Sequence, residues 1–157
     1  FEYYRRSQLQ ALSLPAKVRA LARLLRENLP MTVQGIGIVS PVFAGVDRSC
    51  DPAQPKIYFY DPLGAQFQAV GFASSGSGSM TVRSVLSFEE KHGSPKPCEM
   101  KREEAVCFAL RLLMTAAELD SATGGVNPDN QSFATIRVLS ANGVETIDDE
   151  AQGACMS

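Results

Sequence analysis

The chain has 157 residues, of which 45% are hydrophobic and 20% charged, and its formal net charge at pH 7 is −2. This composition predicts a globular protein and excludes a disordered chain, or one drawn by charge to nucleic acid or to an anionic membrane. No apolar run reaches the roughly 18 residues that a transmembrane helix needs, and no signal peptide is visible, so we expect a cytoplasmic protein.

Cysteine and histidine form no pattern typical of a metal site or a catalytic pair. The four cysteines include no Cys-x-x-Cys pair, and there is one histidine, so no zinc pattern is present. That residue, His92, is expected in a loop without a candidate partner nearby, which argues against a Ser–His or Cys–His nucleophile. We predict free thiols, with Cys107 packed as a small apolar side chain on a helix, and no metal or other cofactor.

The chain begins with the pattern of two helices. Residues 1–13 predict the first. Pro15 suits the opening turn of the second, whose apolar residues recur at helical spacing and which we expect to end near Pro30. The apolar face of this helix consists of Val18, Leu21, Ala22, Leu25 and Leu29.

The period then changes to that of strands. Residues 32–46 predict a strand with a break or bulge, and residues 48–55 a loop. Strands are expected at 56–60 and 66–72, joined by the turn Asp61-Pro62-Leu63-Gly64, because Asp-Pro with a closing Gly is typical of a tight turn. The segment therefore predicts a β-hairpin.

The second half predicts two more helices and a second hairpin. Helices are expected at 79–91 and 101–119, and strands at 133–139 and 144–147 around the turn Asn142-Gly143. Acidic residues open the longer helix, where the helix dipole favours them. The predicted apolar face of that helix consists of Val106, Ala109, Leu110, Leu113 and Ala117.

This order of elements predicts a layered α+β sandwich. Residues 126–131 are expected to form a polar loop. We predict one domain over residues 1–150 and a disordered tail over residues 151–157, with fraying from about Asp148. The strand content is low for covering two helical layers, which suggests that strands before Phe1 are missing.

Two clusters of small residues, Ser74–Ser79 and Asp120–Gly125, lie at the predicted ends of helices. Helix ends gather unsatisfied backbone donors and can hold a carboxylate or an oxyanion. For the first cluster, spacing alone favours a plain loop with Ser79 as the N-cap. The second is more informative, because an acid such as Asp120 is disfavoured at a helix C-terminus unless hydroxyl or N–H groups bond to it. We expect these donors to be Ser121, Thr123 and the N–H groups of the glycines that follow.

These motifs resemble the β-type subunits of 20S proteasomes, most closely the bacterial and archaeal ones. The resemblance rests on Gly76-Ser77-Gly78-Ser79 before a helix, on the helix start Glu103-Glu104-Ala105-Val106, and on Asp120-Ser121-Ala122-Thr123-Gly124-Gly125. The two hairpin turns, at residues 60–64 and 142–143, fall where that fold has them. The resemblance covers roughly residues 1–150.

The resemblance implies a four-layer αββα sandwich of the N-terminal-nucleophile hydrolase type, with its first strands missing. It implies a threonine endopeptidase that degrades unfolded polypeptides to short peptides inside stacked seven-membered rings. The partners would be other β subunits, α-subunit rings and a regulatory ATPase acting through the α ring. The nucleophilic threonine and its lysine would lie before Phe1, so the chain by itself should be inactive.

The resemblance also assigns supporting residues. Ser77 matches the serine that bonds near the amine of the nucleophile, and Asp120 the aspartate that orients this network. Thr123 stands where many members have serine. Asp61 matches a hairpin position that can reach the substrate cleft of a neighbouring subunit. The alternative is a proteolytically silent, structural ring subunit of the same family.

Overall fold

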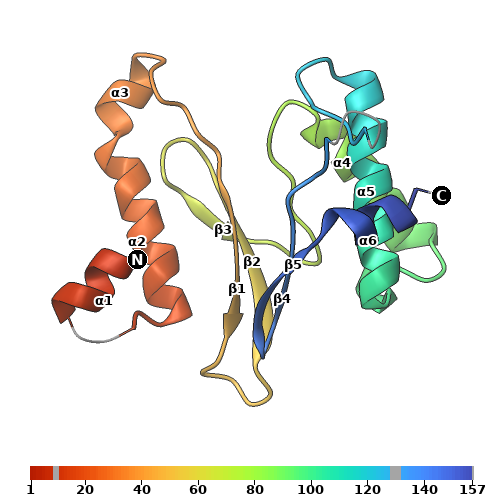
Figure 1. Ribbon diagram of the computed structural model, residues 1–157. Coiled ribbons are helices and arrows are strands. Elements are labelled where there is room, and N and C mark those ends of the chain that lie inside the picture. Colours follow the sequence, from red (N-terminus) through yellow and green to blue (C-terminus); the bar gives the residue numbers. More distant parts are fainter. Residues whose placement is uncertain (9–10, 128–131, 157) are drawn as a thin grey trace. The chain divides into compact units, whose positions relative to one another are not determined.

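Figure 1 shows the protein as a computed structural model, which describes residues 1–8, 11–127 and 132–156. They divide into two compact units, the first made of Phe1–Ala73 with Leu139–Gly143 and the second of Ser74–Val138 with Val144–Ser157. The described ranges contain six α-helices and two small sheets, which confirms the α+β class. A single domain over residues 1–150 stays a prediction, and most of the expected loop at 126–131 lies outside the described residues.

The first unit begins with three helices, and the second of them has the start signals that its sequence predicts. They are α1 (Glu2–Gln8), α2 (Leu14–Glu27) and α3 (Leu29–Val33). Ser13 caps α2 by accepting a hydrogen bond from the N–H of Ala16 at 3.3 Å, and Pro15 lies in the first turn, as predicted.

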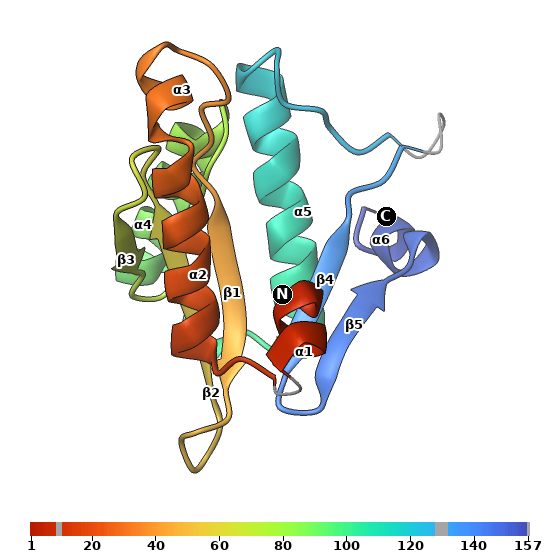
Figure 2. The same cartoon turned by 90° about the vertical axis from the view of Figure 1, so that its left-hand side faces the viewer.

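The first sheet packs against α2. Its strands β1 (Val42–Asp47), β2 (Gln54–Tyr60) and β3 (Gln66–Gln68) are antiparallel in the order β1-β2-β3, so the predicted hairpin is confirmed with a shorter returning strand. Figure 2 shows α2 running along β1. The buried core of this unit consists of Leu14, Val18, Ala22, Leu25 and Tyr60. The Tyr60 hydroxyl also donates to the carbonyl of Val18 at 3.0 Å, which ties the sheet to the helix.

The prediction of one broken strand over residues 32–46 is wrong in its first half. Pro30 does not end the helical region but lies in the first turn of α3, where its missing N–H costs nothing. Thr32 is buried in α3 and donates its hydroxyl to the carbonyl of Asn28 at 3.2 Å. The helix is followed by Gly35 and Gly37, both with positive φ, and the strand begins only at Val42.

Helices dominate the second unit. They are α4 (Ser79–His92), the short 3-10 helix η1 (Pro97–Glu99), α5 (Arg102–Leu119) and α6 (Asp149–Ala154). The strands β4 (Ile136–Ser140) and β5 (Gly143–Ile147) form the hairpin predicted from Asn142-Gly143, whose tip at Leu139–Gly143 belongs to the first unit, and Gly143 has a φ of 138°. No helix among the described residues combines the length and apolar character needed to cross a bilayer.

The longest helix, α5, is buried on more than one side. Val106 and Leu110 lie in a core with Val126 and Ile147, whereas Leu112 and Ala116 are buried on a different side of the helix. The predicted single face included Ala109, which is exposed. A single face is too few for this helix because α5 packs against both α4 and α6, so more than one stripe of it is covered.

The C-terminal segment is helical where a disordered tail was expected. Asp148 caps α6 by accepting from the N–H of Ala151 at 2.8 Å. Gln152 is fully buried and bonds both backbone groups of Ala134, accepting from its N–H at 3.0 Å and donating to its carbonyl at 2.9 Å. The polar composition of the segment did not indicate that Gln152 would be buried, because its hydrogen bonds depend on a partner 18 residues away.

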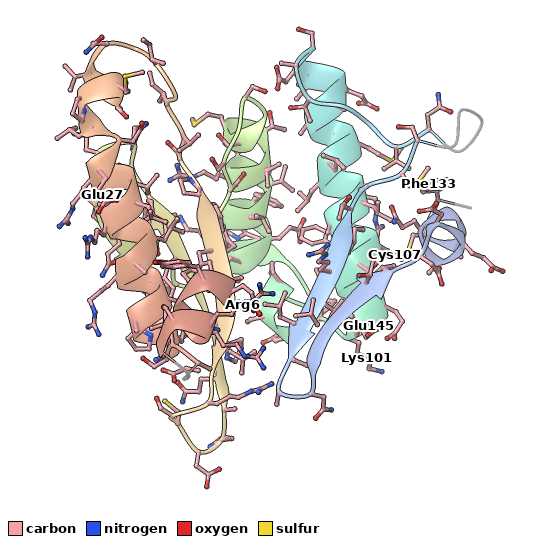
Figure 3. All side chains as sticks on the ribbon, turned by 60° about the vertical axis from the view of Figure 1, so that its left-hand side comes forward. Arg6, Glu27, Lys101, Cys107, Phe133 and Glu145 are labelled. Atoms are coloured by element: carbon pink, nitrogen blue, oxygen red, sulfur yellow. A yellow bond between two sulfur atoms is a disulfide. The ribbon has the colours of Figure 1, made fainter. Side chains whose placement is uncertain are left out.

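The prediction of free thiols is wrong for two of the four cysteines. Cys107 on α5 and Cys155 at the end of α6 form a disulfide with a Cα–Cα distance of 5.1 Å (Figure 3). Cys50 and Cys98 are free. The partners are 48 residues apart, and only the packing of α6 against α5 brings them within bonding range.

Candidate functional site

The first cluster of small residues leads into α4. Gly76 has a φ of 102°, and its carbonyl accepts from the N–H of Ser79 at 3.1 Å. Gly78 is the N-cap and Ser79 the first helical residue, so the prediction of Ser79 as N-cap is wrong. The N-cap Gly78 makes no side-chain capping bond, and Ser77 directly precedes it.

Asp120 ends α5 in an extended conformation and gathers donors around its carboxylate. The Thr123 hydroxyl donates to one carboxylate oxygen at 2.5 Å, and the Ala122 N–H donates to the other at 3.2 Å. The Thr123 N–H donates to the backbone carbonyl of Asp120 at 3.0 Å. The expectation that this acid is held by hydroxyl and N–H groups is confirmed for the hydroxyl of Thr123, whereas the N–H donor to the carboxylate is that of Ala122 and was not predicted.

The two helix ends meet within the second unit. The hydroxyl oxygens of Ser77 and Thr123 are 3.4 Å apart, although the residues are separated by 46 positions. Ser77, Thr123 and Asp120 therefore form one cluster, which we call the Asp120 cluster. Ser77 is exposed, whereas Asp120 and Thr123 are half-buried, so the cluster opens to solvent on the side of Ser77.

Hydrogen bonding keeps the carboxylate of this cluster ionised. The hydroxyl of Ser77, then that of Thr123 and the N–H of Ala122, lower the pKa of Asp120 below its ordinary value, and partial burial opposes them only weakly. The carboxylate is thus a fixed negative charge at neutral pH.

The direction of the hydroxyl protons follows from this charge. Thr123 has one hydroxyl proton and donates it to Asp120, so towards Ser77 its oxygen can only accept. Whether Ser77 donates to Thr123 or to Asp120, its own proton points into the cluster. The free lone pairs of Ser77 then face outward, where they can accept a hydrogen bond from an amine or another donor.

Asp61, the fourth predicted site residue, lies in the first unit and shapes its own turn. Its carboxylate accepts from the N–H of Leu63 at 2.9 Å and from that of Ala65 at 2.8 Å, and its N–H donates to the carbonyl of Ala65 at 3.1 Å. These bonds close the turn between β2 and β3. Its role at a neighbouring substrate cleft stays a prediction.

Sequence reasoning missed a buried acid in the first unit. Asp47 accepts from the ammonium of Lys56 at 2.7 Å, and from the hydroxyl and N–H of Ser49 at 2.6 and 3.1 Å. Lys56 and then Ser49 hold the pKa of Asp47 far below its ordinary value, and Asp47 raises the pKa of Lys56. The local signal was the Asp-x-Ser spacing, which is typical of an Asx turn, but the lysine belongs to the neighbouring strand.

A cavity of about 450 Å³ lies between α4, α5 and the segment that joins them. Its lining includes Val85, Glu89, Met100, Glu104, Phe108 and Arg111. None of the three residues of the Asp120 cluster lines it. Within the described ranges, no three His, Cys, Asp or Glu side chains gather in a way that could hold a metal ion.

Comparisons with known proteins agree on one family. A family model described as "Proteasome subunit" matches residues 1–127. A "Proteasome subunit beta" of Acidothermus cellulolyticus is 34% identical, covering 97% of this chain and 51% of its own length. That of Acidimicrobium ferrooxidans is 32% identical (94% and 51%), and "Proteasome subunit beta 2" of Thermomonospora curvata is 35% identical (95% and 50%). The chain spans about half the length of the curated relatives it matches.

Proposed function

Because this chain belongs to the proteasome β-subunit family, we propose that it is part of a threonine-type endopeptidase subunit of a 20S core particle. Its nucleophilic threonine would lie outside these 157 residues. The observation that carries the proposal is the Asp120 cluster, in which two hydroxyls and one ionised carboxylate meet at the ends of two helices.

The chemistry of the cluster suits the support of an N-terminal nucleophile. Such a nucleophile attacks the scissile carbonyl with its hydroxyl, while its own amine takes up the proton and returns it to the leaving group. The outward lone pairs of Ser77 can accept a hydrogen bond from that amine. The fixed charge of Asp120, relayed through Thr123, would stabilise the positive charge that the amine gains when it takes up the proton, and would hold the amine in one orientation.

The first sheet supports the proposed four-layer sandwich. Val42 pairs with Phe59, which pairs with Phe67, so the three side chains share one face of the sheet. The adjacent Tyr60 lies in the core with α2, which places these three side chains on the opposite face. They are exposed by 40%, 40% and 48%, and Phe59 and Phe67 stack at 5.1 Å. A second sheet would cover this apolar face.

The proposed assembly also rests on membership of the proteasome β-subunit family. We propose neighbouring β subunits in a seven-membered ring, α-subunit rings, a regulatory ATPase acting through them, and unfolded polypeptides as the substrate, in the cytoplasm. Asp61, at the tip of its hairpin, would contribute to the cleft of a neighbouring subunit.

The test is a charge-removing substitution in a longer subunit that carries the threonine, assembled with its α subunit. Asp120→Asn keeps the shape of the side chain but removes its charge, and we expect cleavage of a fluorogenic peptide to fall at least about tenfold. Asp148→Asn is the matched control, because it removes an aspartate charge at another helix end and asparagine is as good an N-cap.

The outcomes separate the two candidate functions. Loss of turnover in Asp120→Asn with normal assembly and normal Asp148→Asn activity supports the protease. A parent particle that assembles but cleaves nothing supports the silent structural subunit. The 157-residue chain alone should be inactive in either case.

A further inference from the structure

Gly78 lies where the start of α4 meets the end of α5. It is buried, and a Cβ atom built on it would lie 2.7 Å from the Thr123 hydroxyl oxygen and 3.5 Å from a carboxylate oxygen of Asp120. On another side the same Cβ would lie 3.2 Å from the Cβ of Ala116, which is 1% exposed. A methyl group at position 78 would therefore be wedged between α5 and the Asp120 cluster.

Space, not backbone conformation, requires glycine at this position. Gly78 has φ −76° and ψ 2°, which any residue adopts. Gly76, two residues earlier, is the opposite case, with a φ of 102° and no atom within 4 Å of its added Cβ apart from its two neighbours in the chain. The two glycines of one motif thus serve different purposes.

The neighbouring atoms cannot easily yield to a side chain. Thr123 is β-branched and short, and its hydroxyl is held at 2.5 Å from Asp120, so moving it away from a methyl group breaks or lengthens that bond. Ala116 is fixed in the helix. Moving α4 instead would carry Ser77 away from Thr123, because Ser77 directly precedes Gly78.

We propose that Gly78 is a positioning residue of the Asp120 cluster: the lack of a side chain lets α4 approach closely enough for Ser77, Thr123 and Asp120 to meet. The hydrogen-bonding part of this statement stands on the geometry of the second unit alone. Its meaning for catalysis rests on the proposed function.

The test titrates Asp120 by carboxyl ¹³C NMR in the 157-residue chain. In Gly78→Ala we expect the pKa of Asp120 to rise towards the ordinary carboxyl value, because the Thr123 and Ser77 hydroxyls move off the carboxylate. A folded Gly78→Ala variant with the parental pKa would overturn the proposal.

Two controls separate positioning from ordinary packing. A Cβ at Gly125 would crowd α5 at 3.2 Å from the Cβ of Ala117 but meets neither Thr123 nor Asp120. One at Gly124 meets nothing within 4 Å apart from its two neighbours in the chain. Both Gly125→Ala and Gly124→Ala should keep the parental pKa of Asp120. An equal rise in Gly125→Ala would show that general strain, not Gly78, controls the carboxylate.

A double variant covers the case in which Gly78→Ala does not fold. Adding Ala116→Gly makes room on the α5 side but leaves the new methyl group against Thr123. We expect this variant to fold and to retain the raised pKa of Asp120. A parental pKa in the folded double variant would contradict the proposal, because the contact with Ala116 would then be the one that matters.

Turnover in a longer, assembled subunit gives the second readout. Gly78→Ala should lower kcat about tenfold or more while KM changes by about twofold or less, since misplacement of a supporting group affects the reacting geometry. An unchanged kcat would overturn the catalytic part. If the parent itself has no turnover, the proposed function fails, while the NMR titration still decides the role of Gly78.

Discussion

Two aspartates, Asp47 in the first unit and Asp120 in the second, accept hydrogen bonds from similar donors but differ in burial and in pairing with a cation. Each accepts one short hydroxyl bond, from Ser49 at 2.6 Å and from Thr123 at 2.5 Å, and one backbone N–H. Asp47 is 4% exposed and paired with the ammonium of Lys56. Asp120 is half-buried and, among the described residues, has no cation within ion-pair distance.

The difference teaches how to separate a structural carboxylate from a candidate functional one. The Asp47 cluster, defined here as Asp47, Ser49 and Lys56, satisfies its charge within one hairpin and needs nothing more. The Asp120 cluster keeps its charge uncompensated and ends in an exposed hydroxyl with free lone pairs. An external cation or amine would complete it.

The largest expected effect sharpens the comparison because it changes the stability of the second unit and leaves the residues of the Asp120 cluster in place. Replacing Cys107 and Cys155 together by serine should lower the free energy of unfolding by up to about 4 kcal/mol, the loop-closure value for a 48-residue separation. Chemical denaturation of the oxidised parent and the double variant measures it. The pKa of Asp120 should stay unchanged.

Cys98→Ser is the control for that experiment, because Cys98 is free and exposed and its replacement should not change stability. Equal stability of the parent with and without a reducing agent would show that the disulfide does not form in solution.

The second largest effect is expected from breaking the ion pair of the Asp47 cluster. Lys56→Met keeps the length of the side chain but leaves the buried carboxylate of Asp47 without its countercharge, a strongly destabilising change. We expect the melting temperature at pH 7 to fall by about 5 °C or more. Arg102→Met removes a cation from an exposed pair with Glu145 and should lower it by about 2 °C or less. Similar losses in the two variants would contradict the view that the buried Asp47 depends on Lys56 for its countercharge.

The smallest expected effect concerns the order in which Asp47 and Asp120 become protonated as the pH falls. Both aspartates have a folded-state pKa below the unfolded value, so the stability that each contributes is fully present above about pH 4 and is lost as the pH falls through the folded-state pKa. Because Asp47 also faces a full positive charge, Asp120 should take up its proton first on acidification. Carboxyl ¹³C shifts recorded from pH 5 downward give the order, and protonation of Asp47 before Asp120 would reverse the comparison.

Local patterns in the sequence were reliable wherever one element decides its own structure. The helical spacing of α2 from Val18 to Leu25, Pro15 in its first turn and the turns at Asp61–Gly64 and Asn142-Gly143 all formed as predicted. Leu29, also predicted on that apolar face, lies outside α2 and is exposed. They depend on hydrogen bonds and dihedral preferences within a few residues. The resemblance to proteasome β subunits, read from short motifs, was also confirmed.

Other features depended on contacts between distant segments. The buried side of α5 at Ala116, the anchoring of α6 by Gln152 and the Cys107–Cys155 disulfide cannot be read from local spacing. Pro30 was misread for a related reason, since proline ends one helix or begins another with similar ease.

The sequence by itself determined which residues could hold a charge at a helix end, because hydroxyls and glycines beside an acid are a local chemical fact. Only the tertiary structure decided that Ser77 reaches Thr123 across 46 residues and that Gly78 leaves the space for it. Such distances follow from how closely two helices pack, and that packing is the sum of many side-chain contacts along both of them.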